Sequence, residues 1–242
     1  MIKVREINKS FSDKNILNNI SFDISNGDSV AIIGQSGTGK SVLLKHLNGL
    51  LKPDFGNVTV DNVSLNNVSY NELQNIRKKM AMVFQFGALF DSMTIRENIE
   101  LAIRSLTNLQ ENNISTRIFK SLNLVNLEGI EDLMPSEISG GMKKRVGIAR
   151  AIAINPEYIL YDEPTTGLDP ITTDKINSLI KKVSDKKKVT SIIVTHNMKT
   201  LRDVANRVIM LYEGSIIFDG EIDDLFSSKD KYIQYFVTGE NK

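Results

Sequence analysis

The sequence predicts an α/β fold in which helices cover a mainly parallel sheet and one helical segment is inserted. Three observations along the 242-residue chain support this fold class. Apolar residues alternate with a period of two in the first third, recur at helical spacing in the middle third, and form short runs between helices in the last third. Strands that alternate with helices are typical of βαβ units, whose strands run parallel.

The first third is expected to begin with a small antiparallel sheet. The segments 20–24 and 58–60 alternate between apolar and polar residues, and the turn sequence Pro-Asp-Phe-Gly at 53–56 precedes the second of them. The run 30–33 is continuously apolar, as expected of a strand that is buried on both faces. A glycine-rich turn and a helix over about 41–51 are expected to follow.

The middle third is expected to form a helical subdomain over about 86–155. A serine or threonine that precedes a glutamate by three residues can form a capping box, and such pairs begin at Ser69 and Thr94. Both pairs therefore predict helix starts. A further helix is expected from about 139 to 154, where an Asn-Pro dipeptide ends it.

The last third is expected to return to strands and helices. Apolar and β-branched residues predict strands at 158–161 and 189–195, and Pro170 marks the start of a helix between them. The segments 208–212 and 216–218 flank a Glu-Gly turn and are expected to form a hairpin.

A single domain is expected over 2–239, and it ends in a tail helix over about 229–239. Apolar residues recur in this tail at near-helical spacing. Two alternatives stay open for it: it docks on another chain, or it packs back on its own domain, as terminal helices often do.

Composition excludes several classes of protein. Apolar residues make up 41% of the chain, which is enough to bury a core and excludes disorder. Thirty basic and twenty-nine acidic residues leave a formal charge of +1, so we expect no nucleic-acid partner. Cysteine is absent, which excludes a disulfide framework. No apolar run reaches the ~18 residues of a membrane-spanning helix, so a membrane role is expected to come through a partner chain.

The strongest motif is G-x-x-x-x-G-K-[ST], and it lies between a predicted strand and a predicted helix. Its residues are Gly34, Gln35, Ser36, Gly37, Thr38, Gly39, Lys40 and Ser41. Glycines let backbone N–H groups converge on phosphates, and the helix N-terminus adds partial positive charge. Lys40 is expected to reach the β- and γ-phosphates, and the Ser41 hydroxyl to ligate Mg²⁺. A fortuitous glycine turn is the alternative, and the strand–loop–helix context disfavours it.

A second motif is an apolar strand that ends in two acids. Asp162 would stand at the tip of this strand and is expected to hold Mg²⁺, whereas the adjacent Glu163 is expected to orient and polarise water as a general base. An acidic turn after a strand is common, so this motif indicates an ATPase only in combination with the phosphate loop. Kinases and GTPases share that loop, but the guanine-specific [NT]-K-x-D element does not occur in the sequence.

A third motif, Ile138-Ser139-Gly140-Gly141-Met142, identifies the class of ATPase. A serine and two glycines open the predicted helix, so a hydroxyl, bare N–H groups and a helix dipole are brought together. The segment resembles the signature motif of the ATP-binding-cassette (ABC) family, which is usually Leu-Ser-Gly-Gly-Gln. An ordinary N-cap at Ser139 is the bland alternative, and it is compatible with this role because the cap geometry exposes the donors.

The resemblance covers nearly the whole chain and implies further features. It implies the ABC nucleotide-binding domain, which is a P-loop NTPase fold with a RecA-like parallel sheet, an N-terminal antiparallel subdomain and a helical insertion. It implies that Gln85 contacts Mg²⁺ or the attacking water, that Asp169 lies in the D-loop, and that His196 hydrogen-bonds the γ-phosphate. Phe11 matches the aromatic residue that stacks on adenine. Bland alternatives are a helix N-cap at Asp169, a structural role for His196 and a core position for Phe11.

The resemblance also implies that two chains share each site. In this family the signature helix of one chain contacts the nucleotide that the phosphate loop of the other chain holds. This sequence has one phosphate loop and one signature motif. A second copy of the chain is therefore expected, in a homodimer with two bound ATP molecules and Mg²⁺.

Details of three segments resemble the ATPases of Mla/MCE lipid transporters. These segments are 84–94, 139–145 and 162–171. Polar-amino-acid importers, the nearest competing group, usually have Gln where Met142 stands. The lipid branch implies a transmembrane permease, an MCE-domain lipid-binding protein and in some systems a small STAS-domain protein, with the ATPase at the cytoplasmic face of the membrane. Another ABC importer and a soluble ABC ATPase without transport function are the alternatives.

Overall fold

A six-stranded sheet forms the centre of the molecule and confirms the predicted α/β fold class. The computed structural model describes residues 1–239, apart from the side chains of Lys186 and Lys187. The strand order is β10-β9-β3-β8-β7-β6, and only the β9–β10 pair is antiparallel among these pairs. The strands are β3 (Ser29–Ile33), β6 (Met80–Val83), β7 (Tyr158–Asp162), β8 (Thr190–Val194), β9 (Arg207–Tyr212) and β10 (Ser215–Glu221).

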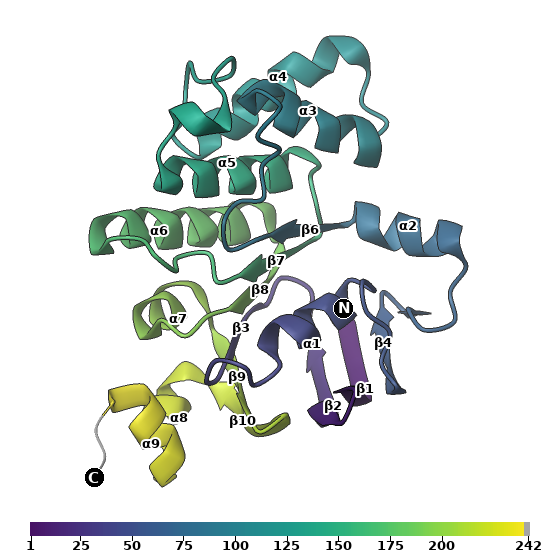
Figure 1. The fold of residues 1–242 in the computed structure, drawn as a ribbon, viewed down its shortest axis with the longest axis vertical. Helices are drawn as coiled ribbons and strands as arrows, with labels where there is room; N and C mark the ends of the chain where they lie inside the picture. Colours follow the sequence, from purple (N-terminus) through teal and green to yellow (C-terminus); the bar gives the residue numbers. More distant parts are fainter. Residues whose placement is uncertain (240–242) are drawn as a thin grey trace.

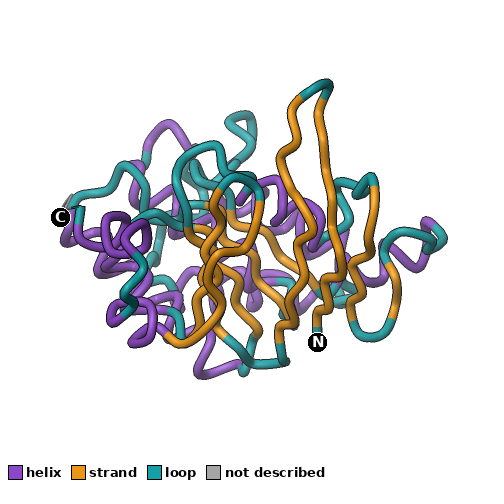
Figure 2. The backbone as a smooth tube through the Cα atoms, turned by 90° about the horizontal axis from the view of Figure 1, so that it is seen from below, coloured by secondary structure: helices purple, strands orange, loops and turns teal. Residues whose placement is uncertain are grey.

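A second, antiparallel sheet lies beside the central one, as the sequence predicts for the N-terminal part. Its strand order is β2-β1-β4-β5. Figure 2 shows a long hairpin, formed by β1 and β2, projecting from the body of the molecule. The strands are β1 (Ile2–Phe11), β2 (Lys14–Ile24), β4 (Phe55–Val60) and β5 (Val63–Ser64).

Helices surround the central sheet and form a lobe above it in Figure 1. Both predicted capping boxes are confirmed: the Ser69 and Thr94 hydroxyls each accept a bond from the N–H of the glutamate three residues on. The lobe consists of α3 (Ile95–Leu106), α4 (Glu111–Leu124) and α5 (Gly140–Ala153), with a short 3₁₀ helix at Pro135–Glu137. The remaining helices are α1 (Lys40–Leu47), α2 (Tyr70–Lys78), α6 (Pro170–Lys187), α7 (Met198–Val204), α8 (Ile222–Ser227) and α9 (Lys231–Thr238).

Alternate residues of β3 belong to different hydrophobic cores. Val30 and Ile32 pack in the core that α1 and the antiparallel sheet share, whereas Ala31 and Ile33 pack toward α7, α8 and α9. Successive side chains of a strand point to opposite faces, so β3 is buried on both sides, as its continuous apolar run predicts. Both cores thus converge on the strand that leads into the phosphate loop.

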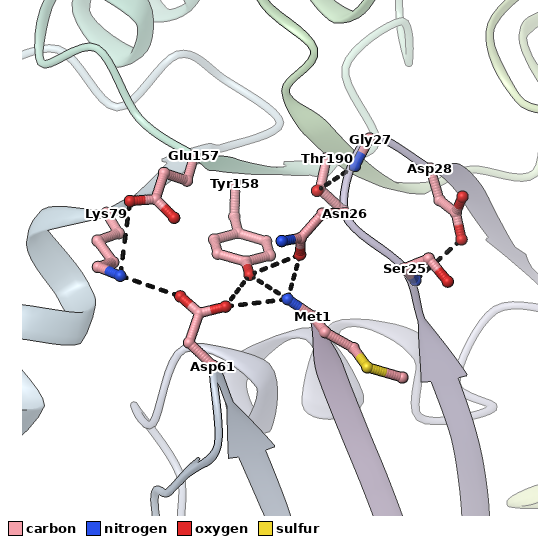
Figure 3. Close-up of polar contacts among 10 residues, drawn as sticks. All are labelled: Met1, Ser25, Asn26, Gly27, Asp28, Asp61, Lys79, Glu157, Tyr158 and Thr190. Carbon is pink, nitrogen blue, oxygen red and sulfur yellow. Dashed lines mark hydrogen bonds and ion pairs between the residues drawn. The ribbon is translucent and has the colours of Figure 1, made fainter.

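A polar cluster joins the two sheets where β1 and β7 begin (Figure 3). Asp61, which follows β4, accepts hydrogen bonds from the Tyr158 hydroxyl at 2.5 Å, the Met1 amine at 2.9 Å and the Lys79 ammonium at 3.0 Å. Burial alone would raise the pKa of Asp61, but these donors outweigh burial and lower it from 3.8 to about 2. The Asp61 cluster is therefore most stable with an ionised carboxylate.

Acidification should destabilise the protein through Asp61. Because its folded-state pKa lies below the ordinary value, its contribution is present above pH ~4 and is lost as the pH falls toward about 2. The unfolding free energy should fall between pH 5 and pH 3, and it should fall by about 1 kcal/mol less in Asp61→Asn than in wild type. This value allows for solvent screening. Urea unfolding at both pH values measures this loss. The exposed Asp132→Asn should not change it, and equal losses in wild type and Asp61→Asn would contradict the expectation.

Candidate functional site

The predicted phosphate-loop residues line a pocket with a volume of about 750 Å³. The pocket lies where β3 ends and α1 begins, so the central sheet and a helix N-terminus position it. Of the predicted loop residues only Thr38 is outside the lining; its hydroxyl bonds the Gln35 carbonyl within the loop at 2.9 Å. The other predicted residues in the lining are Phe11, Gln85, Glu163 and His196.

The loop backbone depends on glycine. Gly34, Gly37 and Gly39 all have positive φ angles, which side chains disfavour. At Gly34 a β-carbon would lie 2.4 Å from the Leu211 carbonyl oxygen, so no side chain fits there without a shift of the backbone. Gly39 begins α1 without a side-chain cap, so the first N–H groups of the helix face the pocket and suit an anion.

Lys40 lies over the loop. Its side chain is buried, and its ammonium donates hydrogen bonds to the carbonyls of Gly34 at 2.8 Å and Gln35 at 2.7 Å. Burial lowers the pKa of Lys40, and the nearby carboxylates of Glu163 and Asp162 oppose this shift. The pocket therefore holds a cation where a phosphate chain could be bound.

Two of the three residues predicted to hold Mg²⁺ are in direct contact. The Ser41 hydroxyl donates to the Asp162 carboxylate at 2.8 Å, although these residues are 121 positions apart. Ser41 and Gln85 line the pocket, whereas Asp162 is outside its lining. Hydroxyl, carboxylate and amide oxygens are the ligand types that Mg²⁺ prefers, and it usually takes few protein ligands beside water and phosphate. These residues therefore fit the ion.

Glu163 and His196 form a hydrogen-bonded pair. The His196 Nδ1 atom lies 2.9 Å from one Glu163 oxygen, and the Thr166 hydroxyl donates to the other at 2.9 Å. Glu163 has a φ of +51°, and its N–H donates to the Val194 carbonyl of the neighbouring strand. The backbone is thus anchored to the neighbouring strand, and two hydrogen bonds hold the carboxylate in place, as a general base requires.

The signature residues are not part of this pocket. Ser139 caps α5 by accepting from the Met142 N–H, which confirms its N-cap role, and the Met142 side chain packs against the core of the helical lobe. Asp169 similarly caps α6 by accepting from Thr172. The described lining of the pocket contains none of Ser139, Gly140, Gly141, Met142 and Asp169. Their proposed role toward a nucleotide therefore requires another chain.

Phe11 lies at the end of β1 and is 45% exposed, so the alternative of a core position is wrong. Its ring faces the pocket, and the Lys9 ammonium lies 5.4 Å from the ring centroid. A partly exposed aromatic ring at the pocket edge is suited to stacking on a flat base.

Contacts between α5 and the loops that follow β6 and β7 were not foreseen from the sequence. The buried Lys144 ammonium donates to the Thr166 carbonyl at 2.5 Å, and the Arg150 guanidinium donates to the carbonyls of Gly87 at 2.9 Å and Ala88 at 2.8 Å. Gly147, between them, packs against Gly87 so closely that a β-carbon would lie 3.2 Å from it. The sequence signal for these contacts is the spacing of Lys144 and Arg150, which lie three residues before and three residues after Gly147.

The chain is similar to known proteins over nearly its whole length. The family model described as "ABC transporter" matches residues 17–166. The Arabidopsis thaliana protein Trigalactosyldiacylglycerol 3, chloroplastic, is 40% identical over 99% of this chain and 74% of its own length. The Haemophilus influenzae intermembrane phospholipid transport system ATP-binding protein MlaF is 37% identical over 100% of this chain and 91% of its own length.

A methionine importer and a solved cassette are also similar to the chain. The Enterococcus faecalis methionine import ATP-binding protein MetN 2 is 40% identical over 93% of this chain and 66% of its own length. A dimeric ATP-binding cassette in a post-hydrolysis state with ADP and phosphate superposes with a TM-score of 0.83, at 34% identity, over 92% of this chain and 99% of the cassette.

Proposed function

Because the chain belongs to the ABC transporter family and is the ATP-hydrolysing subunit of a transporter, we propose that it drives the transport of phospholipids through a separate permease. The observation that carries this proposal is the match to a phospholipid-transport ATPase over the entire chain. The segments 84–94 and 139–145, which resemble the lipid branch, include Gln85 and the start of α5 respectively. Among the described residues no helix could cross a membrane, so the permease would be another chain.

The pocket supports a division of roles in ATP hydrolysis. The phosphate loop would bind the phosphates through its backbone N–H groups and Lys40, and Phe11 would stack on adenine. Ser41, Asp162 and Gln85 would hold Mg²⁺, which supplies positive charge against the β- and γ-phosphates. Glu163, positioned by His196 and Thr166, would accept a proton from the attacking water. Most of the catalysis is positioning and charge stabilisation.

A homodimer would complete each site. Ser139, Gly140, Gly141, Met142 and Asp169 lie outside the pocket of their own chain, and the similar cassette with ADP and phosphate is dimeric. In the proposed dimer, the exposed start of α5 of one subunit faces the nucleotide of the other. This arrangement is isologous, so two equivalent sites form.

Mixing two inactive variants tests the shared site. Ser139→Arg should retain ATP binding but lose more than about tenfold of the ATPase activity, because a bulky charge at the signature blocks close approach of the partner. Lys40→Ala should also be inactive. A mixed dimer of the two has one site with an intact phosphate loop and an intact signature, so its formation should restore activity. Absence of recovery in a verified mixed dimer would contradict the shared site.

Co-purification distinguishes the lipid transporter from its alternatives. We expect the tagged chain, extracted from membranes in mild detergent, to bring down a multi-spanning permease and an MCE-domain protein, and in some systems a STAS-domain protein. The methionine-importer relative makes an amino-acid importer the second candidate. A permease with an amino-acid-binding protein would support that candidate and contradict the lipid proposal. Recovery of the ATPase without any membrane-spanning chain would favour a soluble ABC ATPase and contradict attachment to the cytoplasmic face.

Lys144 should affect turnover more than ATP binding. Lys144→Ala leaves the Thr166 carbonyl without its donor and loosens the loop that also positions Glu163. We expect kcat to fall about tenfold while the affinity for ATP stays within twofold. Steady-state kinetics and a nucleotide titration separate the two quantities. Lys120→Ala, on an exposed position of α4, should leave both unchanged, and a selective loss of affinity in Lys144→Ala would contradict this role.

A further inference from the structure

The last helix of the described chain contributes a wall of the nucleotide pocket. Phe236, on α9, lines the same pocket as the phosphate loop and His196, although it lies 40 residues beyond His196 in the sequence. It is partly buried and is the one lining residue that comes from the tail. Figure 1 shows α9 beside α8, on the side of the central sheet where α7 lies. No motif in the sequence indicates this position.

Packing on the core of its own domain fixes α9 in this place. Ile233, Phe236 and Val237 recur at helical spacing on one face, and Ile233 is 4% exposed. This face packs in a core with Ile33, which directly precedes the phosphate loop, and with Met210. The helix therefore lies against the strand that carries the loop.

Polar and aromatic contacts hold the first half of α9. Asp230 caps its start by accepting from the Ile233 N–H at 3.0 Å. The Gln234 amide donates to the carbonyls of Phe226 at 3.2 Å and Ser228 at 2.5 Å, and so joins α9 to α8. The Tyr232 and Tyr212 rings are 4.2 Å apart between centroids. Because these contacts leave the helix little freedom, the direction of Phe236 toward the pocket is a consequence of the fold. In the structure the tail thus packs on its own domain.

We propose that Phe236 is a further nucleotide-binding residue, whose ring contacts bound ATP from the side of the pocket where α9 lies. The inference rests on the proposed ATP site and extends it to the tail. An apolar ring in the lining, which also includes the exposed His196, would exclude water from the pocket, and dry surroundings strengthen electrostatic contacts with phosphates. ATP and the docked tail would then stabilise each other, because linkage between two binding events is reciprocal.

Nucleotide titration of the full-length chain tests the contact. With a fluorescent ATP analogue, Phe236→Ala should bind about three- to tenfold more weakly, which is the range expected for loss of one aromatic contact. Phe236→Tyr keeps the ring and should bind as wild type does. The matched control is Tyr235→Ala, because Tyr235 is the preceding residue of α9, is 41% exposed and does not line the pocket. It should bind normally.

Hydrogen exchange of the wild-type chain tests the reciprocal effect. Amides of α9 should exchange at least threefold more slowly with saturating ATP than without it. Unchanged exchange would overturn the coupling, and this measurement does not depend on whether a variant folds.

The outcomes separate this inference from the proposed function. If Lys40→Ala loses ATP binding but folded Phe236→Ala keeps wild-type affinity, the Phe236 contact is refuted and the ATP site stands. If Lys40→Ala binds as wild type does, the assignment of the pocket itself fails.

Discussion

Lys40→Ala should abolish ATP binding at any practical concentration, with an affinity at least about 100-fold below wild type. The ammonium is buried over the phosphate loop and hydrogen-bonds the carbonyls of Gly34 and Gln35. Its charge is directed at the place where a phosphate chain would lie. Two charge-assisted hydrogen bonds from this ammonium to bound phosphates, of about 1.5–3 kcal/mol each, would account for the expected loss.

The matched control for this variant lies on the same helix. Lys45 is exposed on α1, so Lys45→Ala removes the same charge without changing the pocket. Titration with a fluorescent ATP analogue should give wild-type affinity for Lys45→Ala and no saturable binding for Lys40→Ala. Equal affinities for ATP in the two variants would contradict the assignment of the phosphate loop to the ATP site.

Glu163→Gln should bind ATP and hydrolyse it at least about 100-fold more slowly than wild type. The amide retains the size of the side chain, but it cannot take a proton from water. Binding should persist because Lys40 and the loop backbone are unchanged. In the proposed cycle, hydrolysis reopens the dimer, so the variant should accumulate as an ATP-bound dimer.

Single-turnover kinetics and light scattering measure these two properties. Glu157→Gln is the control, because Glu157 directly precedes β7 whereas Glu163 directly follows it. It should hydrolyse ATP normally and should not accumulate as an ATP-bound dimer. If Glu163→Gln turns over at the wild-type rate, another group accepts the proton.

Sequence patterns predicted the parts of the site that lie in continuous segments. The glycine spacing of the phosphate loop and the two acids after an apolar strand can be recognised locally, because strand, loop and helix follow one another along the chain. The capping boxes at Ser69 and Thr94 are also local, and both form. The central sheet followed from the alternation of apolar runs and helices, since βαβ connections require parallel strands.

Contacts between distant segments could not be predicted in this way. Lys144 reaches Thr166 only because α5 packs across the β7 loop, and Phe236 reaches the pocket only because α9 packs beneath β3. The left-handed backbone of Glu163 depends on a bond to a neighbouring strand. Each depends on tertiary packing, which local periodicity does not encode.

The Asp61 cluster holds together the starts of two strands that differ in length. It holds the start of β1 through Met1 and the start of β7 through Tyr158. The ten residues of β1 and the five of β7 span about 33 Å and about 17 Å, and they end at Phe11 and Asp162 respectively. A tilt of given angle at the starts of the strands would displace Phe11 about twice as far as Asp162. The hairpin tip is therefore the more sensitive end: loss of the Asp61 contacts would displace the Phe11 ring further than the Asp162 carboxylate.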